Sequence, residues 1–228
     1  RTADALHTAE ILHRRWTRWT NGPLDTTKHR LRLFASRHEM RQALPGLGWA
    51  EAIYHDGICD QYDDVSAERP WQWLIHEATH QLAWEDAHLE LPRWANEGLA
   101  CLFGVSRIRH DRLILGSVEP ETYPTWWLAK KPLSRDLARD LKAGLLVAPS
   151  QILNEPDGIG IASTLNAHYL SWWSMAHFFN ATDSVAWRDW VLHDATKPGL
   201  LRRFGPEATL DKRWYAHVLN LQDSANQH

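Results

Sequence analysis

The spacing of apolar side chains near the N-terminus predicts a helix followed by a strand. Residues 3–22 carry apolar side chains every three or four positions and end in an Asn-Gly pair, which predicts a capped helix. Leu31, Leu33 and Ala35 alternate with polar residues, so we expect a strand that points these three side chains inward.

Turn-forming residues divide the next stretch of the chain. Residues 37–44 predict a short helix that ends at a Pro-Gly pair. Asp56-Gly57 separates two β-favouring runs, a pattern typical of a hairpin. The first 70 residues are therefore expected to mix helices and strands.

From Pro70 onward the pattern is mostly helical. Pro70 and Pro92 each stand where a helix is expected to begin, and proline is favoured in the first turn. Residues 107–118 predict a short hairpin.

Two later helices carry recognisable end signals. Residues 133–144 predict a helix capped by Ser134 and ended by Gly144. A strongly apolar helix is expected from a cap at Ser163 to about residue 180, and two shorter helices follow around residues 184–194 and 210–221.

No internal repeat or linker interrupts this pattern. We therefore predict one α+β domain made of two lobes. Residues 1–91 form a small mixed lobe with antiparallel strands, and residues 92–228 form a mainly helical lobe.

Charge and hydropathy exclude two classes of partner. The chain has 25 basic and 28 acidic residues without a basic patch, so nucleic acid is not an expected partner. No run of 18 apolar residues exists, so no membrane span is predicted. The sequence indicates neither the oligomeric state nor whether Cys59 and Cys101 form a disulfide.

Metal-binding chemistry is indicated by "HEATH", in which His76, Glu77 and His80 interrupt an apolar stretch. On a helix, His76 and His80 are one turn apart on one face, so both imidazoles can reach one zinc ion. Glu77 is placed to contact a metal-bound water. His-Glu-x-x-His therefore supplies two ligands and a general base.

The third ligand has three candidates, of which Glu97 is favoured. It follows His80 by 17 residues, and a turn over residues 85–91 would return its carboxylate across the first helix. Gly98 beside it permits two helices to approach closely. Asp86 has the position of the last metzincin ligand, but Ala83 replaces the glycine of that pattern, and His88 matches no known spacing.

"HEATHQL" followed by "LPRWANEGLA" resembles the gluzincin zinc metallopeptidases, the clan of thermolysin and aminopeptidase N, and most closely the bacterial families with HExxH…PxWxxEGLA. The resemblance is strongest over residues 71–103. It implies a zincin-like fold, a zinc ion held by His76, His80 and Glu97, and peptide or protein substrates. Cys101 stands where thermolysin-like enzymes have an acidic residue, which favours the aminopeptidase-like branch.

The resemblance also suggests a donor for the oxyanion of the transition state. In the aminopeptidase-like branch this donor is a Tyr at the start of an apolar helix, and "AHYLSWW" places it at Tyr169, with His168 as the alternative. His177 is expected to be a packed core histidine.

Substrate binding and location are expected from the resemblance as well. Gluzincins hold an extended peptide against an edge strand, a role that falls on Ala52, Ile53 and Tyr54. The missing start Met and the resemblance together suggest a periplasmic or secreted protein. The sequence does not distinguish endopeptidase from exopeptidase action.

Two other functions remain open. The first is a catalytically inactive, zinc-bearing binding module on a peptidase fold, against which the retention of Glu77 argues. The second is a carbohydrate-binding protein, suggested by 14 tryptophans and by the pairs Trp126-Trp127 and Trp172-Trp173.

Overall fold

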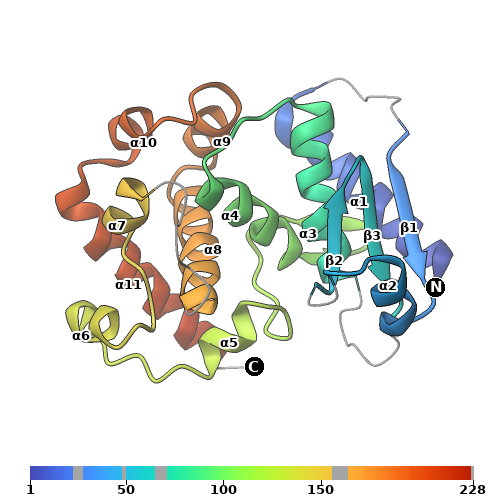
Figure 1. Cartoon of the computed structure of the whole chain (residues 1–228). Coiled ribbons are helices and arrows are strands. Elements are labelled where there is room, and N and C mark those ends of the chain that lie inside the picture. The colour runs from blue at the N-terminus through green and yellow to red at the C-terminus, as the bar shows by residue number, and fades with distance from the viewer. Residues whose placement is uncertain (23–27, 48–49, 65–70, 156–163, 227–228) are drawn as a thin grey trace. The chain divides into compact units, whose positions relative to one another are not determined.

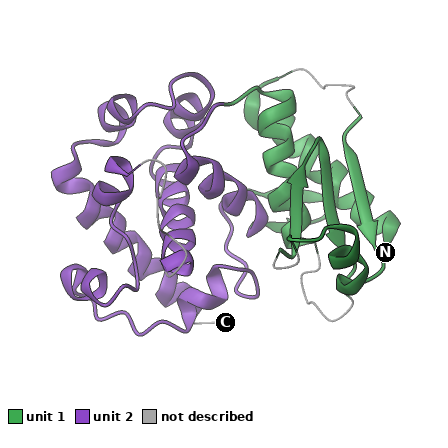
Figure 2. Ribbon diagram, viewed as in Figure 1, with its two compact units in different colours: residues 1–89, 106–115 green, residues 90–105, 116–228 purple. Residues whose placement is uncertain are grey.

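The computed structural model describes residues 1–22, 28–47, 50–64, 71–155 and 164–226. The chain is α+β and divides into two compact units, shown in Figure 2. Unit 1 contains residues 1–89 and 106–115, and unit 2 contains residues 90–105 and 116–228. The sequence had assigned residues 106–115 to the helical lobe, whereas they pack with unit 1.

Unit 1 contains a three-stranded sheet and its helices (Figure 1). The strands β1 (Arg30–Phe34), β2 (Ala52–His55) and β3 (Ile58–Tyr62) lie in the order β1-β3-β2. β2 and β3 are antiparallel, whereas β1 and β3 are parallel. The expected antiparallel strands are thus only part of a mixed sheet, because β1 pairs with a strand distant in sequence.

The predicted turns and caps of unit 1 are confirmed at several positions. Helix α1 (Thr2–Thr20) ends at Asn21 in the left-handed conformation. Asp56 and Gly57 both have positive φ angles of 48° and 71°, as the two central residues of a type I′ hairpin require. In β1, Leu31 and Leu33 are partly buried and Phe34 is buried, whereas the inward position predicted for Ala35 is wrong, because the strand ends at Phe34 and Ala35 is exposed.

Helix α3 (Gln72–Gln81) packs against α1, β2 and β3. It continues without a break into a π-helical turn, η1 (Leu82–Asp86). The turn expected from residue 85 therefore begins later. Pro70, the expected first-turn proline, lies outside the described residues.

The remaining elements of unit 1 are α2 (Arg37–Ala43) and a hairpin of β4 (Arg107–Arg109) and β5 (Arg112–Ile114). Both were predicted. β5 packs against α1, which brings the hairpin into unit 1.

Unit 2 is helical. Its helices are α4 (Arg93–Gly104), α5 (Thr125–Ala129), α6 (Leu137–Lys142), α7 (Pro149–Asn154), α8 (Leu165–Thr182), α9 (Ser184–His193), α10 (Lys197–Phe204) and α11 (Glu207–Ala225). The long helices α8 and α11 pack together (Figure 1), and α8 also packs against α4 and α9. The sequence had not predicted the short helices α5, α7 and α10.

The caps of unit 2 differ from expectation at two helices. Asp136 caps α6, because its side chain accepts a hydrogen bond from the Arg139 N–H, so Ser134 is not the cap. Ser134 instead donates from N–H and Oγ to Asp140. For α8 the residue before the helix is Thr164, and Ser163 lies outside the described residues.

Tryptophan side chains build the core of unit 2. Trp94 lies near Trp190, Trp187 and Phe179, with ring centroids 5.5 to 6.2 Å apart. Trp172 and Trp173 are buried, which argues against this pair as a sugar-binding platform. His177 is also buried, as expected.

Within the described ranges, every helix is too short or too polar to cross a bilayer. Both cysteines are described, and both are buried free thiols, so they do not form a disulfide.

Candidate functional site

Helix α3 presents His76, Glu77 and His80 in unit 1. The i, i+4 spacing places both imidazoles on one face, and their Nε2 atoms lie 3.2 Å apart. The two rings meet edge to face, with centroids 4.9 Å apart. His76 is buried, and His80 is partly buried.

This geometry fits two ligands of one zinc ion. Ligand nitrogens about 2.0–2.1 Å from a tetrahedral zinc lie about 3.3 Å from each other. The observed separation of 3.2 Å therefore needs no rearrangement of α3 for both rings to bind the same ion.

The carboxylate of Glu77 is hydrogen-bonded to the backbone of strand β2. Its Oε2 accepts a hydrogen bond of 2.8 Å from the Tyr54 N–H, and its Oε1 lies 4.0 Å from His76 Nε2. The carboxylate is therefore held in one orientation by the backbone of β2, close to the imidazole pair. A general base that acts on a water next to a metal needs this placement.

The strand that holds Glu77 is the predicted edge strand. β2 lies at the end of the strand order, so its other edge has no strand partner among the described residues. The Tyr54 N–H is already used by Glu77, so a peptide added to this edge would have to bond to other backbone groups, such as those of Ala52.

The Glu77 carboxylate affects the pKa of one buried neighbour, Cys59. Burial raises the pKa of the Cys59 thiol well above its usual value, and the charges of Glu77 and Asp60 raise it further. Cys59 is therefore a neutral, buried thiol and not a nucleophile.

Glu97 lies in unit 2, in α4, where its side chain is partly buried. Its neighbours Trp94, Leu99, Ala100 and Leu102 are buried, as the apolar setting in the sequence predicted. A Cβ atom on Gly98 would lie 2.6 Å from the Trp172 carbonyl oxygen, so the close approach expected here is made to α8.

The other two candidate ligands have different surroundings. Asp86 ends η1, and its carboxylate lies within 4.8 Å of a ring nitrogen of His13 and of His29. His88 is exposed and has a positive φ angle of 50°.

The two candidate oxyanion donors lie in the first turns of α8, in unit 2. Tyr169 is partly buried, with its ring centroid 5.2 Å from Trp172 and 6.0 Å from Tyr123. His168 Nδ1 donates to the Thr164 carbonyl oxygen at 3.0 Å, so Nε2 is the ring nitrogen that remains for a substrate.

Sequence reasoning did not find the group formed by His13, His29 and Asp86. These residues are far apart in the chain and share no motif. One signal was present, because His13 occupies the apolar face of α1 between buried residues.

Comparison with known proteins shows only partial likenesses. No family model and no solved structure matches the chain. The chain is 30% identical over 172 residues to a biosynthetic arginine decarboxylase of Alkalilimnicola ehrlichii, covering 72% of this chain and 25% of that protein. It is 36% identical over 67 residues to human eukaryotic translation initiation factor 4E type 1B, covering 29% of this chain and 26% of that protein.

The chain thus spans about a quarter of the length of the curated relatives it matches. These likenesses assign no family, and the functional argument rests on the residues of the site.

Proposed function

We propose that this protein is a zinc-dependent peptide hydrolase of the gluzincin type, with zinc held by His76, His80 and Glu97. The observation that carries the proposal is the pair of imidazole nitrogens 3.2 Å apart on α3. With Glu97 as the third ligand, which the resemblance to gluzincins suggests, the donor set would contain two nitrogens and one oxygen. This set is typical of catalytic zinc sites, which leave a position for water.

Zinc in such a site lowers the pKa of its water and polarises the carbonyl group of the scissile bond. The chain's own contribution is proton transfer by Glu77. Because Oε2 accepts the Tyr54 N–H, the carboxylate keeps its orientation while it takes a proton from the attacking water. It then passes this proton to the leaving amine.

Tyr169 is proposed as the donor to the developing oxyanion, with His168 as the alternative. Its position in the second turn of α8 supports this role, because the rigid helix fixes where the phenol lies. The substrate is proposed to be a peptide or protein that extends along β2, at Ala52 and Ile53.

An inactive binding module and a carbohydrate-binding protein are the rival functions. The backbone hydrogen bond that orients Glu77 favours an active site, because a purely structural metal site has no use for an oriented base. Of the tryptophan pairs, Trp126 and Trp127 remain accessible, but each lies beside the ammonium group of Lys130 or Lys131.

The test is hydrolysis of a mixed peptide library by wild type and Glu77→Gln. The variant should keep its zinc and lose activity by about 10²- to 10⁴-fold, because only the base is removed. Glu39→Gln is the matched control, since Glu39 belongs to the chain's other His-Glu pair and accepts the Ala35 N–H at the start of α2. Equal activity of wild type and Glu77→Gln would contradict the mechanism.

A further inference from the structure

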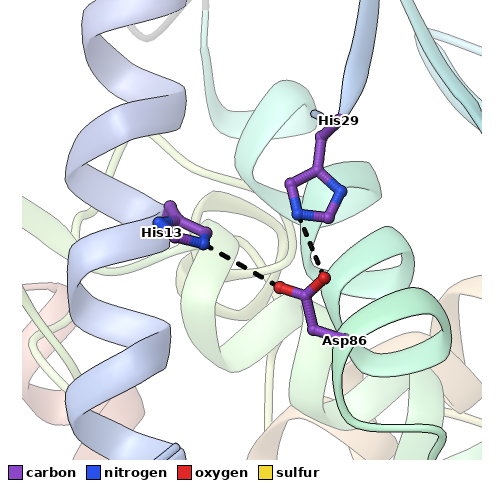
Figure 3. A group of neighbouring side chains, drawn as sticks. All are labelled: His13, His29 and Asp86. Carbon is purple, nitrogen blue, oxygen red and sulfur yellow. Dashed lines mark ion pairs between the residues drawn. The ribbon is translucent and has the colours of Figure 1, made fainter. Parts of the chain in front are cut away.

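A second group of metal-ligating side chains lies within unit 1 (Figure 3). His13 extends from α1, His29 directly precedes β1, and Asp86 ends η1. One ligand atom from each lies within 4.8 Å of the others. None of these residues belongs to the site of the proposed hydrolysis.

The carboxylate of Asp86 lies between the two imidazoles (Figure 3). Its Oδ1 lies 3.1 Å from His29 Nε2, and its Oδ2 lies 3.9 Å from His13 Nε2. His29 Nε2 is buried. Although it lies close to Asp86 Oδ1, it makes no hydrogen bond within the described residues. A buried ring nitrogen that faces a carboxylate in this way fits a metal ion shared by the two groups, or an ion pair if the imidazole is protonated.

A second layer of side chains fixes the orientation of His29. Its Nδ1 lies 3.3 Å from Glu85 Oε2, which favours the proton on Nδ1 and leaves the Nε2 lone pair for a metal. Ligating histidines usually donate their other nitrogen to a carboxylate in this way. Glu85 is itself held by the Tyr54 hydroxyl, which donates to Oε1 at 2.9 Å.

The Tyr54 hydroxyl is a stable part of this layer. Burial raises the pKa of Tyr54 to about 12, and the hydrogen bond to Glu85 adds to the effect. The phenol therefore stays protonated, and remains a donor, throughout the neutral range.

A cavity reaches two of the three ligands, His13 and His29. It has a volume of about 310 Å³ and is also lined by apolar residues such as Leu12, Leu74 and Leu82. Arg14 and Arg30 also line it, so the cavity itself does not concentrate cations. Binding must come from the three ligands.

We propose that His13, His29 and Asp86 bind a second divalent metal ion, of the zinc class that imidazole and carboxylate ligands suit. The ion would join α1, the start of β1 and η1, three segments of unit 1 that are distant in sequence. It would therefore stabilise this unit in proportion to zinc occupancy. The alternative is a metal-free group in which Asp86 pairs with protonated imidazoles.

The experiment isolates this site from the proposed catalytic one. In a His76→Ala/His80→Ala chain, equilibrium dialysis against Zn²⁺ with elemental analysis should show about one bound ion, and Zn²⁺ should raise the Tm. Adding Asp86→Asn should weaken this binding by more than about tenfold and abolish the Tm shift. Tyr54→Phe, which removes only the hydroxyl behind Glu85, should weaken it by about 10-fold.

His7→Ala in the same background is the matched control. His7 also lies on α1 and pairs with an aspartate, Asp111, at 2.9 Å, but both side chains are exposed. This variant should bind zinc as its parent does. Should His76→Ala/His80→Ala misfold, Asp86→Asn alone should lower the zinc content of the wild-type chain by about one ion. No zinc in the folded double variant, or binding unchanged by Asp86→Asn, overturns the proposal.

Discussion

Tyr54 contacts two carboxylates of the same helical stretch through different atoms. Its N–H donates to Glu77, and its hydroxyl donates to Glu85. One residue of the edge strand therefore orients the proposed base and also the carboxylate behind His29. A substitution at Tyr54 alters only the second contact, because the backbone N–H remains in every variant except proline.

Single substitutions distinguish Tyr169 from His168 as the proposed oxyanion donor. Tyr169→Phe removes one hydroxyl and keeps the ring that packs beside Trp172. If Tyr169 is the oxyanion donor, kcat should fall by about 10²- to 10³-fold with little change in KM, while His168→Ala retains most activity. Steady-state kinetics of both variants decide the matter, and the reverse ranking assigns the role to His168.

For single residues, the sequence predicts contacts between positions that are close along the chain. His76, Glu77 and His80 follow from one helical turn, and the 3.2 Å separation of the two nitrogens agrees with that spacing. The bond from the Tyr54 N–H to Glu77 joins residues 23 positions apart, and the group around Asp86 joins three separate segments. No spacing rule predicts such contacts, because they depend on how β2 and α1 pack against α3.

At the scale of elements, α4 and α8 approach each other closely at Gly98. Gly98→Ala should lower the free energy of unfolding by about 1–3 kcal/mol, because the new Cβ would lie 2.6 Å from the Trp172 carbonyl oxygen. Denaturant unfolding measures the change. Adding Ala176→Gly should not restore stability, since the nearest atom belongs to the backbone; full recovery would contradict this packing.

A histidine pair joins α8 to α11 in unit 2. His177 Nε2 donates to the Gly116 carbonyl group at 2.9 Å, so its Nδ1 accepts from His217 Nε2 at 2.8 Å when both rings are neutral. Burial lowers the pKa of both residues, and His177 lowers that of His217 further, to about 4.

This pair predicts acid sensitivity with a defined direction. In the unfolded chain these histidines titrate near pH 6.5, so between about pH 6.5 and 4 the unfolded state binds more protons than the folded state. The free energy of unfolding should be fully retained above this range and should fall as the pH decreases through it. The Tm of His217→Gln should decline less steeply than that of wild type over this range, and an equal slope would exclude the pair as a cause.

The sequence predicts elements well where an end signal is local. The left-handed Asn21, the Asp56-Gly57 hairpin and the hairpin near residue 110 all follow from turn chemistry. The predicted cap of α6, Ser134, is wrong: Asp136 caps this helix, and Ser134 instead donates to the buried carboxylate of Asp140. The parallel pairing of β1 with β3 has no local signal at all.

In the whole molecule, composition and pattern indicate an α+β chain with a mixed first part and a helical second part, and the structure confirms this class. The zincin-like fold stays a prediction. Residues 106–115 pack with unit 1 because β5 contacts α1, a long-range contact that the order of elements along the chain does not indicate.

The proposed function depends on a zinc ion at His76, His80 and Glu97. The most direct measurement is the zinc content per chain, by elemental analysis, of wild type, His80→Ala, Glu97→Ala and Glu77→Gln. Glu97→Ala and His80→Ala should each contain about one ion less than wild type, and Glu77→Gln should contain the same amount as wild type. Zinc content unchanged by both ligand substitutions, or no zinc in wild type after reconstitution, would contradict the account.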